Sequence, residues 1–509
     1  MNILLIYPQY PDTYWSFKHV LKFVSKKAAF PPLGLLTVAA LLPKEWNKKL
    51  VDLNVTKLID DQINWADMVF LSAMIVQTKS AEEIIHRCKA LGKTVVAGGP
   101  AATIMHAKLT GVDHLVLNEA EITLPQFLND WNKGQPKAIY RSKDRPDITK
   151  TPLPLWSLIK LKDYVTMPIQ YSRGCPFDCE FCDIVAMYGR TPRTKSPDQM
   201  IREMQSLREA GWKGDVFIVD DNFIGNKSRV KKMLPYLSRW QKKHKYPFTF
   251  ITEASTNLAD DTELMQLMSA ANFQKVFVGI ETPSIDSLKE CGKYQNTSRC
   301  LEEAVTCIQQ NGMQVMGGFI VGFDNDTDDI FEAQIKFIQK VGIVTAMVGL
   351  LNALPQTRLW HRLKAEGRLL HDTTGENTDA GVNFVPVMAK EKLIAGYQKI
   401  ISTIYSPPHY YDRIHTFINN YKPRAKRNFS ICDLKATIRS MWHIGILSRS
   451  RLHYWKLIFK TSLRKFKALP TAIELAVCGL HFERVSARVL SVSCDRSTDK
   501  TGYNYTELL

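Results

Sequence analysis

Short apolar runs alternate with amphipathic stretches along the first 132 residues. The runs predict buried strands, and the stretches between them have helical spacing. The strands are expected at 3–7, 50–53, 68–73, 94–97 and 115–117, and the helices at 33–42, 81–91 and 123–131. Strands that alternate with helices predict an α/β domain with a parallel, doubly wound (Rossmann-like) sheet over residues 1–132. Ligands of such sheets bind beyond the carboxyl ends of the strands.

A second series of the same pattern begins after a Pro- and Gly-punctuated linker at 133–164. Its strands are expected at 168–172, 216–220, 248–253, 276–280, 315–321 and 346–351, and its helices at 197–210, 227–242, 261–270, 299–310 and 327–341. Six strand–helix units predict a partial (β/α)6 barrel over 165–355, with its active site at the strand carboxyl ends. Two missing units would leave one side open for a large substrate or a docking domain.

Residues 356–493 predict a mostly helical extension, and 494–509 a disordered tail. The net charge of +17 is uneven, because residues 421–467 hold thirteen Lys and Arg against a single acid, Asp433, a net +12. This basic segment predicts contact with an anionic surface. Within it, one helical face is apolar and is flanked by bases, as in a membrane-surface helix. An ordinary helix packed on the barrel would give the same pattern. The apolar face consists of Leu452, Trp455, Phe459, Leu463 and Phe466.

Three cysteines, Cys175, Cys179 and Cys182, follow the first strand of the second series at C-x3-C-x2-C spacing. Thiolates at such spacing favour an iron–sulfur cluster with one iron left open. A zinc site and a redox dithiol are the alternatives, but no nearby histidine completes a zinc knuckle and the spacing is not C-x-x-C. Ten cysteines without regular pairing, no signal peptide and no apolar run of bilayer length favour the cytoplasm.

The octapeptide from Cys175 to Cys182, with Phe181 before the last cysteine, resembles the signature of the radical S-adenosylmethionine (SAM) enzymes. In that family the open iron of a [4Fe-4S] cluster chelates SAM, and reduction releases a 5′-deoxyadenosyl radical. The resemblance implies that polar groups at other strand ends, together with a glycine of the fifth strand and the aromatic residue of the signature, bind SAM or shield the cluster. The residues are Phe181, Asp221, Glu253, Glu281 and Gly318. The alternative for the acids, and for Asp220, is a helix cap.

The N-terminal domain resembles the cobalamin-binding domain that precedes many radical SAM barrels. The resemblance assigns cobalamin contacts to the strand ends, namely to Ser72, Gly98, Gly99, Glu119 and Glu121. The D-x-H-x-x-G motif that supplies a histidine to cobalt is absent, because Asp113 and His114 are adjacent. Any cobalamin is therefore expected to bind without a histidine ligand. A degenerate domain kept only for structure is the alternative.

Segments at 352–359, 377–378, 383–384 and 405–408 resemble a subgroup that includes the hopanoid C-2 methylases. The resemblance implies a cobalamin-dependent radical SAM methyltransferase that acts on an unactivated carbon, with a small-molecule or lipid substrate. It also implies an electron donor such as flavodoxin or ferredoxin. A rearrangement or cyclisation without methyl transfer is one alternative, and a nucleic-acid-binding protein with a structural cluster is another. The sequence disfavours nucleic acid, because no RNA-binding motif is present. We expect a cytoplasmic enzyme, peripheral at the inner face of the membrane.

Overall fold

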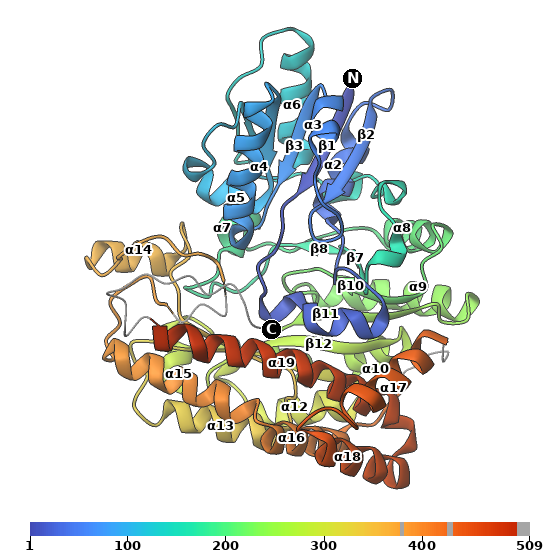
Figure 1. Ribbon diagram of the computed structural model, residues 1–509, viewed down its shortest axis with the longest axis vertical. Coiled ribbons are helices and arrows are strands. Elements are labelled where there is room, and N and C mark those ends of the chain that lie inside the picture. Colours follow the sequence, from blue (N-terminus) through green and yellow to red (C-terminus); the bar gives the residue numbers. More distant parts are fainter. Residues whose placement is uncertain (377–380, 425–430, 496–509) are drawn as a thin grey trace.

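The structure, a computed structural model, describes residues 1–376, 381–424 and 431–495. The tail predicted to be disordered lies outside these ranges, except for 494–495 at the end of the last helix, and so do residues 377–378. Figure 1 shows the N-terminal sheet domain at the top, a second sheet below it, and the C-terminal helices beneath and in front of that sheet.

The N-terminal sheet is parallel and doubly wound, as predicted. Its strand order is β2-β1-β3-β4-β5-β6. The strands are β1 (Asn2–Tyr7), β2 (Asn47–Asp52), β3 (Met68–Ser72), β4 (Thr94–Gly98), β5 (His114–Val116) and β6 (Ile139–Tyr140). Alternate side chains of β1 enter two cores, since Ile3 and Leu5 face one side of the sheet and Leu4 and Ile6 the other. The strand β6 falls inside the predicted linker, so the sheet continues beyond residue 132.

Helices cover both faces of this sheet. Residues of α2 (Leu33–Leu41) and α6 (Ala120–Asn132) share one core, and residues of α3 (Asp60–Trp65), α4 (Thr78–Ala90) and α5 (Gly99–Met105) share the other. Neither α3 nor α5 was predicted. Both have fewer than two full turns, which is too short for a helical period to register in the sequence.

The second sheet has the six parallel strands that the sequence predicts, in the order β14-β13-β12-β11-β10-β7. They are β7 (Met167–Ile169), β10 (Gly214–Ile218), β11 (Phe248–Ala254), β12 (Phe273–Glu281), β13 (Gln314–Val321) and β14 (Ala346–Leu350). The intervening helices are α8 (Pro197–Glu209), α9 (Lys227–Lys243), α10 (Thr262–Ala270), α12 (Leu301–Gln310) and α13 (Ile330–Val341). On β12, Val276, Val278 and Ile280 are buried beneath helices, so Phe277 and Gly279 face the barrel interior.

An unpredicted excursion between β1 and α2, residues 8–32, leaves the N-terminal domain and lies against the barrel. We call it the arm; it contains η1 (Tyr14–Ser16), α1 (Lys18–Leu21) and η2 (Lys22–Val24). The indole Nε1 of Trp15 donates to the sulfur of Met347 at 3.0 Å, and its ring meets Phe277 edge-on inside the barrel. The arm thus fills part of the space that the missing strands leave.

The C-terminal extension closes the same side. Its helices are α14 (Arg358–Ala365), α15 (Lys390–Ile404), α16 (Pro407–Asn420), α17 (Ile431–His443), α18 (Arg451–Arg464) and α19 (Leu469–Asp495). In Figure 1 the long α19 crosses in front of the barrel strands. Glu474 of α19 pairs with Lys275 of β12, and Phe482 stacks on Tyr14 of the arm at 4.6 Å. The open side predicted for a docking domain is therefore occupied by the chain itself.

The apolar face predicted within the basic segment does not pack on the barrel. Leu452, Phe459, Leu463 and Phe466 are 67–77% exposed, whereas Tyr454 on the opposite side of α18 is buried. The alternative of an ordinary packed amphipathic helix is therefore wrong for this face. No helix of the described ranges is long and apolar enough to cross a bilayer.

Candidate active site

The cysteine loop begins where β7 ends, at the carboxyl edge of the barrel, and runs between β8 (Ser172–Arg173) and β9 (Arg193–Thr194). Cys175, Cys179 and Cys182 are half-buried free thiols. Burial raises the pKa of all three, and the charges of Cys175 and Cys179 further raise the pKa of Cys182. The three sulfurs are therefore near enough to influence one another. In the described part of the chain no three His, Cys, Asp or Glu side chains are arranged to hold a single metal ion.

Hydrogen-bond donors and a cation lie near these thiols. The amide Nδ2 of Asn222 lies 3.9 Å from the Cys175 sulfur, and Nε2 of Gln295 lies 3.9 Å from the Cys179 sulfur. The ammonium group of Lys293 acts on both cysteines, because its charge lowers their pKa against the effect of burial. Amide N–H groups and a cation suit a thiolate cluster of net negative charge. The donor set thus fits an iron–sulfur cluster. Asn222 belongs to the polar turn after the second barrel strand, and no sequence motif marks Gln295 or Lys293.

Three carboxylates gather beside the loop at the ends of β10 and β11. Burial raises the pKa of Asp220 to about 6 and of Asp221 to about 7, and burial with the charges of these two raises that of Glu253 to about 8. Asp220 accepts from the backbone N–H of Tyr171 at 2.7 Å, and Asp221 accepts from that of Gly174 at 3.3 Å. The helix-cap alternative is therefore wrong for both, and α9 is instead capped by Asn226, whose side chain accepts from the N–H of Arg229.

Glu281 ends β12 in a left-handed conformation, with φ of 65°, and pairs with Lys293. It caps no helix, because α11 (Ile285–Glu290) is capped by Ser284. Gly318 lies on the adjacent β13, where an added Cβ would meet the Phe277 ring at 2.9 Å. The glycine therefore makes room for an aromatic ring inside the barrel. Phe181 meets Phe323 with ring centroids 6.3 Å apart, so it belongs to the apolar wall of the loop.

The polar residues of the cysteine signature face the C-terminal extension. Glu180 is buried and accepts from Nε of Arg362 at 2.7 Å, and Asp178 pairs with Arg358 at 2.9 Å. Both arginines lie on α14. The extension therefore fixes the cysteine loop directly, although the sequence offered no signal for this pairing.

Ser72, Gly98 and Gly99 meet at the carboxyl ends of β3 and β4. Gly99 has φ of 85°, and an added Cβ would lie 2.3 Å from the Ser72 hydroxyl. A Cβ added at Gly98 would lie 2.9 Å from the carbonyl oxygen of Val116. Close packing among these strand ends thus demands both glycines. They lie at the edge of the sheet where ligands of doubly wound folds bind.

Glu119 and Glu121, at the start of α6, form an interdomain clamp with Arg173 and Arg193 of the barrel. Arg173 binds Glu121 through two bonds of 2.7 and 3.0 Å and Glu119 at 2.7 Å, and Arg193 binds Glu119 at 2.8 Å. Burial would raise the pKa of Glu121, but Arg173 lowers it below its usual value. Both carboxylates are thus engaged by arginines, and their predicted contact with cobalamin stays a prediction.

A cavity of about 220 Å³ lies where the N-terminal domain, the linker, the cysteine loop and the start of the extension meet. Asn118 lines it, and the amide Oδ1 of this residue is buried without a partner. The cavity is smaller than the roughly 300–1,000 Å³ of ordinary ligand pockets, so it can take only part of a large ligand. Its lining consists of Thr103, Asn118, Arg141, Ser142, Lys143, Arg145, Ala186 and Gln356.

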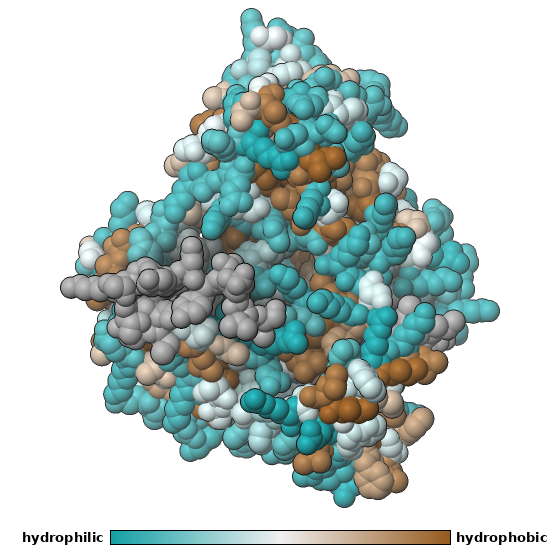
Figure 2. Space-filling model, viewed as in Figure 1, coloured by the Kyte–Doolittle hydropathy of each residue, from teal (hydrophilic) through white to brown (hydrophobic). Residues whose placement is uncertain are grey.

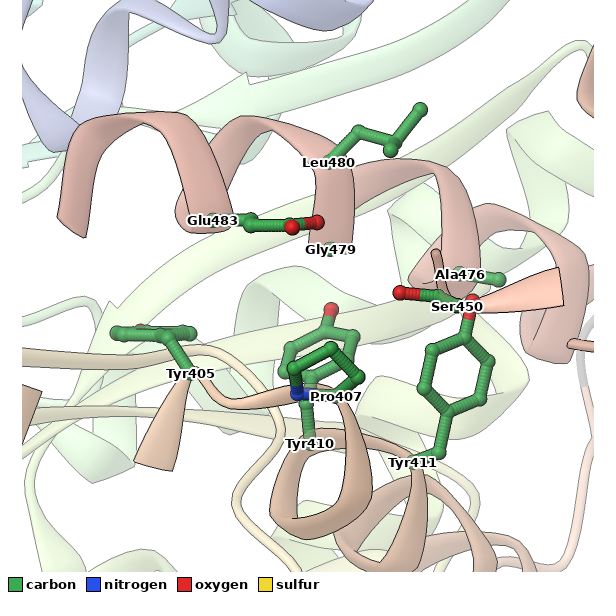
Figure 3. A pocket seen from close by; sticks show the side chains of 9 residues that line it. All are labelled: Tyr405, Pro407, Tyr410, Tyr411, Ser450, Ala476, Gly479, Leu480 and Glu483. Atoms are coloured by element: carbon green, nitrogen blue, oxygen red, sulfur yellow. The ribbon is translucent and has the colours of Figure 1, made fainter. Parts of the chain in front are cut away.

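A second, much smaller cavity lies among the C-terminal helices. Figure 3 shows Tyr405, Tyr410 and Tyr411 below the helix that carries Gly479 and Glu483. Its volume of about 10 Å³ holds at most one water molecule. The 405–408 motif has a structural role here, because the Tyr405 hydroxyl donates to the carbonyl of Ala346 at 2.6 Å.

Comparison with protein families divides the chain as the fold does. Residues 24–128 match the B12 binding domain, 169–338 the radical SAM superfamily, and 357–493 a domain of unknown function. A parallel barrel that carries a three-cysteine loop beneath a B12-type sheet defines a cobalamin-binding radical SAM protein.

The relatives extend this assignment over almost the whole chain. An uncharacterized methyltransferase of Synechocystis sp. is 44% identical, with 89% of this chain and 86% of that protein aligned. The hopanoid C-2 methylase of Rhodopseudomonas palustris is 34% identical over 91% of this chain and 90% of that protein. The chain therefore belongs to the cobalamin-dependent radical SAM methyltransferase family and is a radical SAM enzyme. The cofactors are a [4Fe-4S] cluster, SAM and cobalamin, as the sequence predicts.

Solved structures share the fold. A radical SAM methyltransferase from Kitasatospora setae, with cobalamin and a [4Fe-4S] cluster bound, superposes with a TM-score of 0.59 at 14% identity, covering 96% of this chain and 99% of that one. A cobalamin-dependent SAM radical enzyme with aqua-cobalamin bound gives a TM-score of 0.62 at 14% identity, covering 98% and 81%. The arrangement of B12-type sheet over partial barrel is common to all three.

Proposed function

We propose that this enzyme transfers a methyl group to an unactivated carbon of a polycyclic or isoprenoid lipid. The observation that carries the proposal is the 34% identity to a hopanoid C-2 methylase over nine-tenths of both chains. This likeness includes the extension whose α14 arginines hold the cysteine loop. Since the likeness runs through the parts that build the site, it favours a related substrate as well as a related reaction.

The barrel interior supports an apolar substrate. Its half-buried positions carry mostly apolar side chains, and the pleat of each strand directs them inward. Of its polar groups, Glu253 lies beside the cysteine loop and Lys275 is neutralised by Glu474. The apolar positions are Phe217, Ile251, Phe277, Met316 and Met347. The arm packs on three of them, since Trp15 contacts Phe277 and Met347 and Phe30 contacts Phe217, so the aromatic rings of the arm are part of this lining.

Cys175, Cys179 and Cys182 would hold the cluster, with the amides of Asn222 and Gln295 near two of the sulfurs and the charge of Lys293 acting on the same two. The bound cofactors supply the carbon radical and the methyl group, which protein side chains cannot supply. The chain's own part is to hold and orient both cofactors and to exclude water from the site.

Asp221, Glu253 and Glu281 are the groups that we propose to bind the polar parts of SAM. Glu253, with a pKa of about 8, would enter the site protonated at neutral pH and could donate one hydrogen bond. Gly318 and Phe181 would complete the apolar side of that site. For cobalamin, the Ser72–Gly98–Gly99 surface is the proposed contact, and we assign Glu119 and Glu121 to the clamp that positions the two domains. The one-electron reductant is proposed to be a flavodoxin or ferredoxin.

The test is a product assay with anaerobically purified enzyme, SAM, a low-potential reductant and a polycyclic lipid extract. Methylated lipid should accumulate together with 5′-deoxyadenosine. Changing any one of the three cysteines to Ala should abolish both products while the fold remains, and Cys300→Ala, an exposed cysteine outside the loop, should have no effect. 5′-Deoxyadenosine without any methylated product would favour the rearrangement or cyclisation alternative.

A further inference from the structure

The exposed apolar residues of this protein are concentrated in one place. Of the 21 large apolar side chains that are exposed in the described residues, ten lie between 434 and 466. We call the surface formed by these ten the hairpin patch, because it covers α17, α18 and the turn between them. Its members are Leu434, Ile438, Trp442, Ile446, Leu447, Leu452, Trp455, Phe459, Leu463 and Phe466.

The hairpin that carries the patch is firmly held by its other side. Tyr454 and Leu457 are fully buried, and the Tyr454 hydroxyl meets the Ser440 hydroxyl of α17 at 2.9 Å. The indole of Trp455 donates to the carbonyl of Gly445 at 3.0 Å, which fixes the turn between the helices. The exposure of the patch is therefore a property of a packed hairpin and does not arise from a helix that lacks a place in the fold.

Cations border the patch. Six exposed bases lie on α18 and its flanks, and in the part of the chain that the structure describes none of them forms an ion pair. No acid occurs between residues 434 and 467. The six are Arg449, Arg451, Lys456, Lys460, Arg464 and Lys467.

We propose that the hairpin patch is a docking surface for an anionic lipid bilayer. Ten exposed large apolar side chains within one helical hairpin and its flank mark an interaction site, and the unpaired bases beside them call for an anionic partner. A second copy of the chain would bring two sets of these bases face to face in a symmetric interface, which is repulsive. A nucleic acid would pair with the bases but would leave exposed Leu, Ile and Phe side chains without a partner. A bilayer accommodates both the apolar side chains and the bases. The rings and aliphatic side chains would lie at the headgroup level, and the bases would lie against anionic headgroups.

The position of the patch suits such docking. In Figure 1, α18 lies at the lower end of the molecule, away from the N-terminal sheet, and α17 lies above it on the right, and Figure 2 shows apolar surface at the lower right. The hairpin also contacts the arm, since Arg439 of α17 donates to the carbonyls of Lys22 and Phe23 at 2.9 Å. The docking surface is thus joined to the segment that enters the barrel. The inference goes beyond the proposed reaction and does not require the substrate to be a lipid.

Vesicle flotation tests the proposal with the full chain. Phosphatidylcholine vesicles with about 30% phosphatidylglycerol should carry the protein at low salt, and vesicles of phosphatidylcholine alone should bind far less. Raising the salt to about 0.5 M should weaken binding, because the Debye length falls. The triple change Lys456→Glu, Lys460→Glu and Arg464→Glu should lower partitioning by about 100-fold or more, since each base near an anionic surface is worth about fivefold.

A matched control separates the local effect from net charge. Lys57, Lys133 and Lys242 are exposed and belong to segments other than the hairpin, so their joint change to Glu removes the same charge and should leave most of the binding. The apolar contribution is tested with Leu452→Ser, Phe459→Ser and Leu463→Ser, which touch no core and should reduce binding at both salt concentrations.

Three results would overturn the proposal. One is equal binding by the hairpin and control triple variants. Another is no flotation, combined with retention on RNA that falls steeply with salt, which would assign the bases to nucleic acid. The third is a dimer in sedimentation velocity that the serine variants dissociate, which would assign the patch to a second copy.

Discussion

At the scale of single residues, the clamp joins the cofactor domains through charges that are taken out of water. Glu119 and Arg173 have only 3% and 11% of their side chains exposed. A buried carboxylate that loses its arginine costs several kcal/mol, because the remaining charge has neither water nor a partner. The clamp therefore acts as a positioning device between the B12-type sheet and the cysteine loop, which follows Arg173 directly in the chain.

We predict that Arg173→Met lowers the free energy of unfolding by about 3–5 kcal/mol. The double variant Arg173→Met with Glu121→Gln should recover part of this loss, because it removes one of the unpaired charges. Arg190→Met, at an exposed arginine of the same loop, is the control and should cost under about 0.5 kcal/mol. Denaturant unfolding measures all three. Iron content should stay unchanged in each variant. An Arg173 variant that is as stable as the Arg190 variant would contradict the stabilising role of the clamp.

At the scale of elements, the arm and α19 complete a barrel that its own strands leave open. The contact between them includes His481, whose Nε2 donates to the carbonyl of Tyr14 at 2.9 Å. The other ring nitrogen, Nδ1, is buried without a partner. Burial lowers the pKa of His481 to about 4, because the charged imidazolium would be removed from water there. The junction is therefore built for a neutral imidazole.

This junction should weaken in acid. An unfolded histidine titrates near 6.5, so the unfolded chain binds more protons than the folded chain between about pH 6.5 and 4. The stability contributed by neutral His481 is complete above pH 6.5 and should be lost as the pH falls to 4, by up to about 3 kcal/mol. His481→Gln should flatten that part of the stability profile relative to the wild type.

The control for this experiment is His86→Gln, at an exposed position of α4, which should leave the profile unchanged. Thermal melts across this pH range provide the measurement. Parallel profiles for the wild type and His481→Gln would show that His481 ionises freely in the folded protein.

At the scale of the whole molecule, the ligand-binding edge of one sheet faces that of another. Ser72, Gly98 and Gly99 lie at the strand ends of the B12-type sheet, and the clamp beside them reaches the barrel at Arg173. His114 is at the opposite, amino end of β5, where its Nδ1 lies 2.8 Å from the Lys137 carbonyl. It is therefore placed away from the edge where cobalamin is expected.

We predict that the Co(II) form of bound cobalamin shows no histidine nitrogen coupling in its EPR spectrum. His106 is the residue to test, because it follows α5 and its Nδ1 is buried without a partner. His106→Ala should leave the spectrum and the cobalamin content unchanged, and His114→Ala serves as the matched control. Nitrogen coupling in the wild type that disappears in His106→Ala would contradict the absence of a histidine ligand.

The sequence by itself determined the two parallel sheets and the cysteine loop. Both signals are local, since strand and helix periods repeat within a few residues and all three thiols lie within eight residues of one loop. Because the cysteine signature is local in the sequence, it was sufficient to indicate the family without any tertiary contact. Short elements, such as α3, α5, the strand β6 and those of the arm, escaped this kind of prediction.

The tertiary structure alone decided what surrounds the thiols and what closes the barrel. Glu180 and Arg362 are 182 residues apart, and His481 and Tyr14 are 467 apart, so no period or spacing connects them. It also decided which face of α18 is packed, because amphipathic spacing shows that a helix has an apolar face but not whether the core covers that face. Tyr454 and Leu457 are buried in the core, whereas Leu452, Phe459 and Leu463 are exposed.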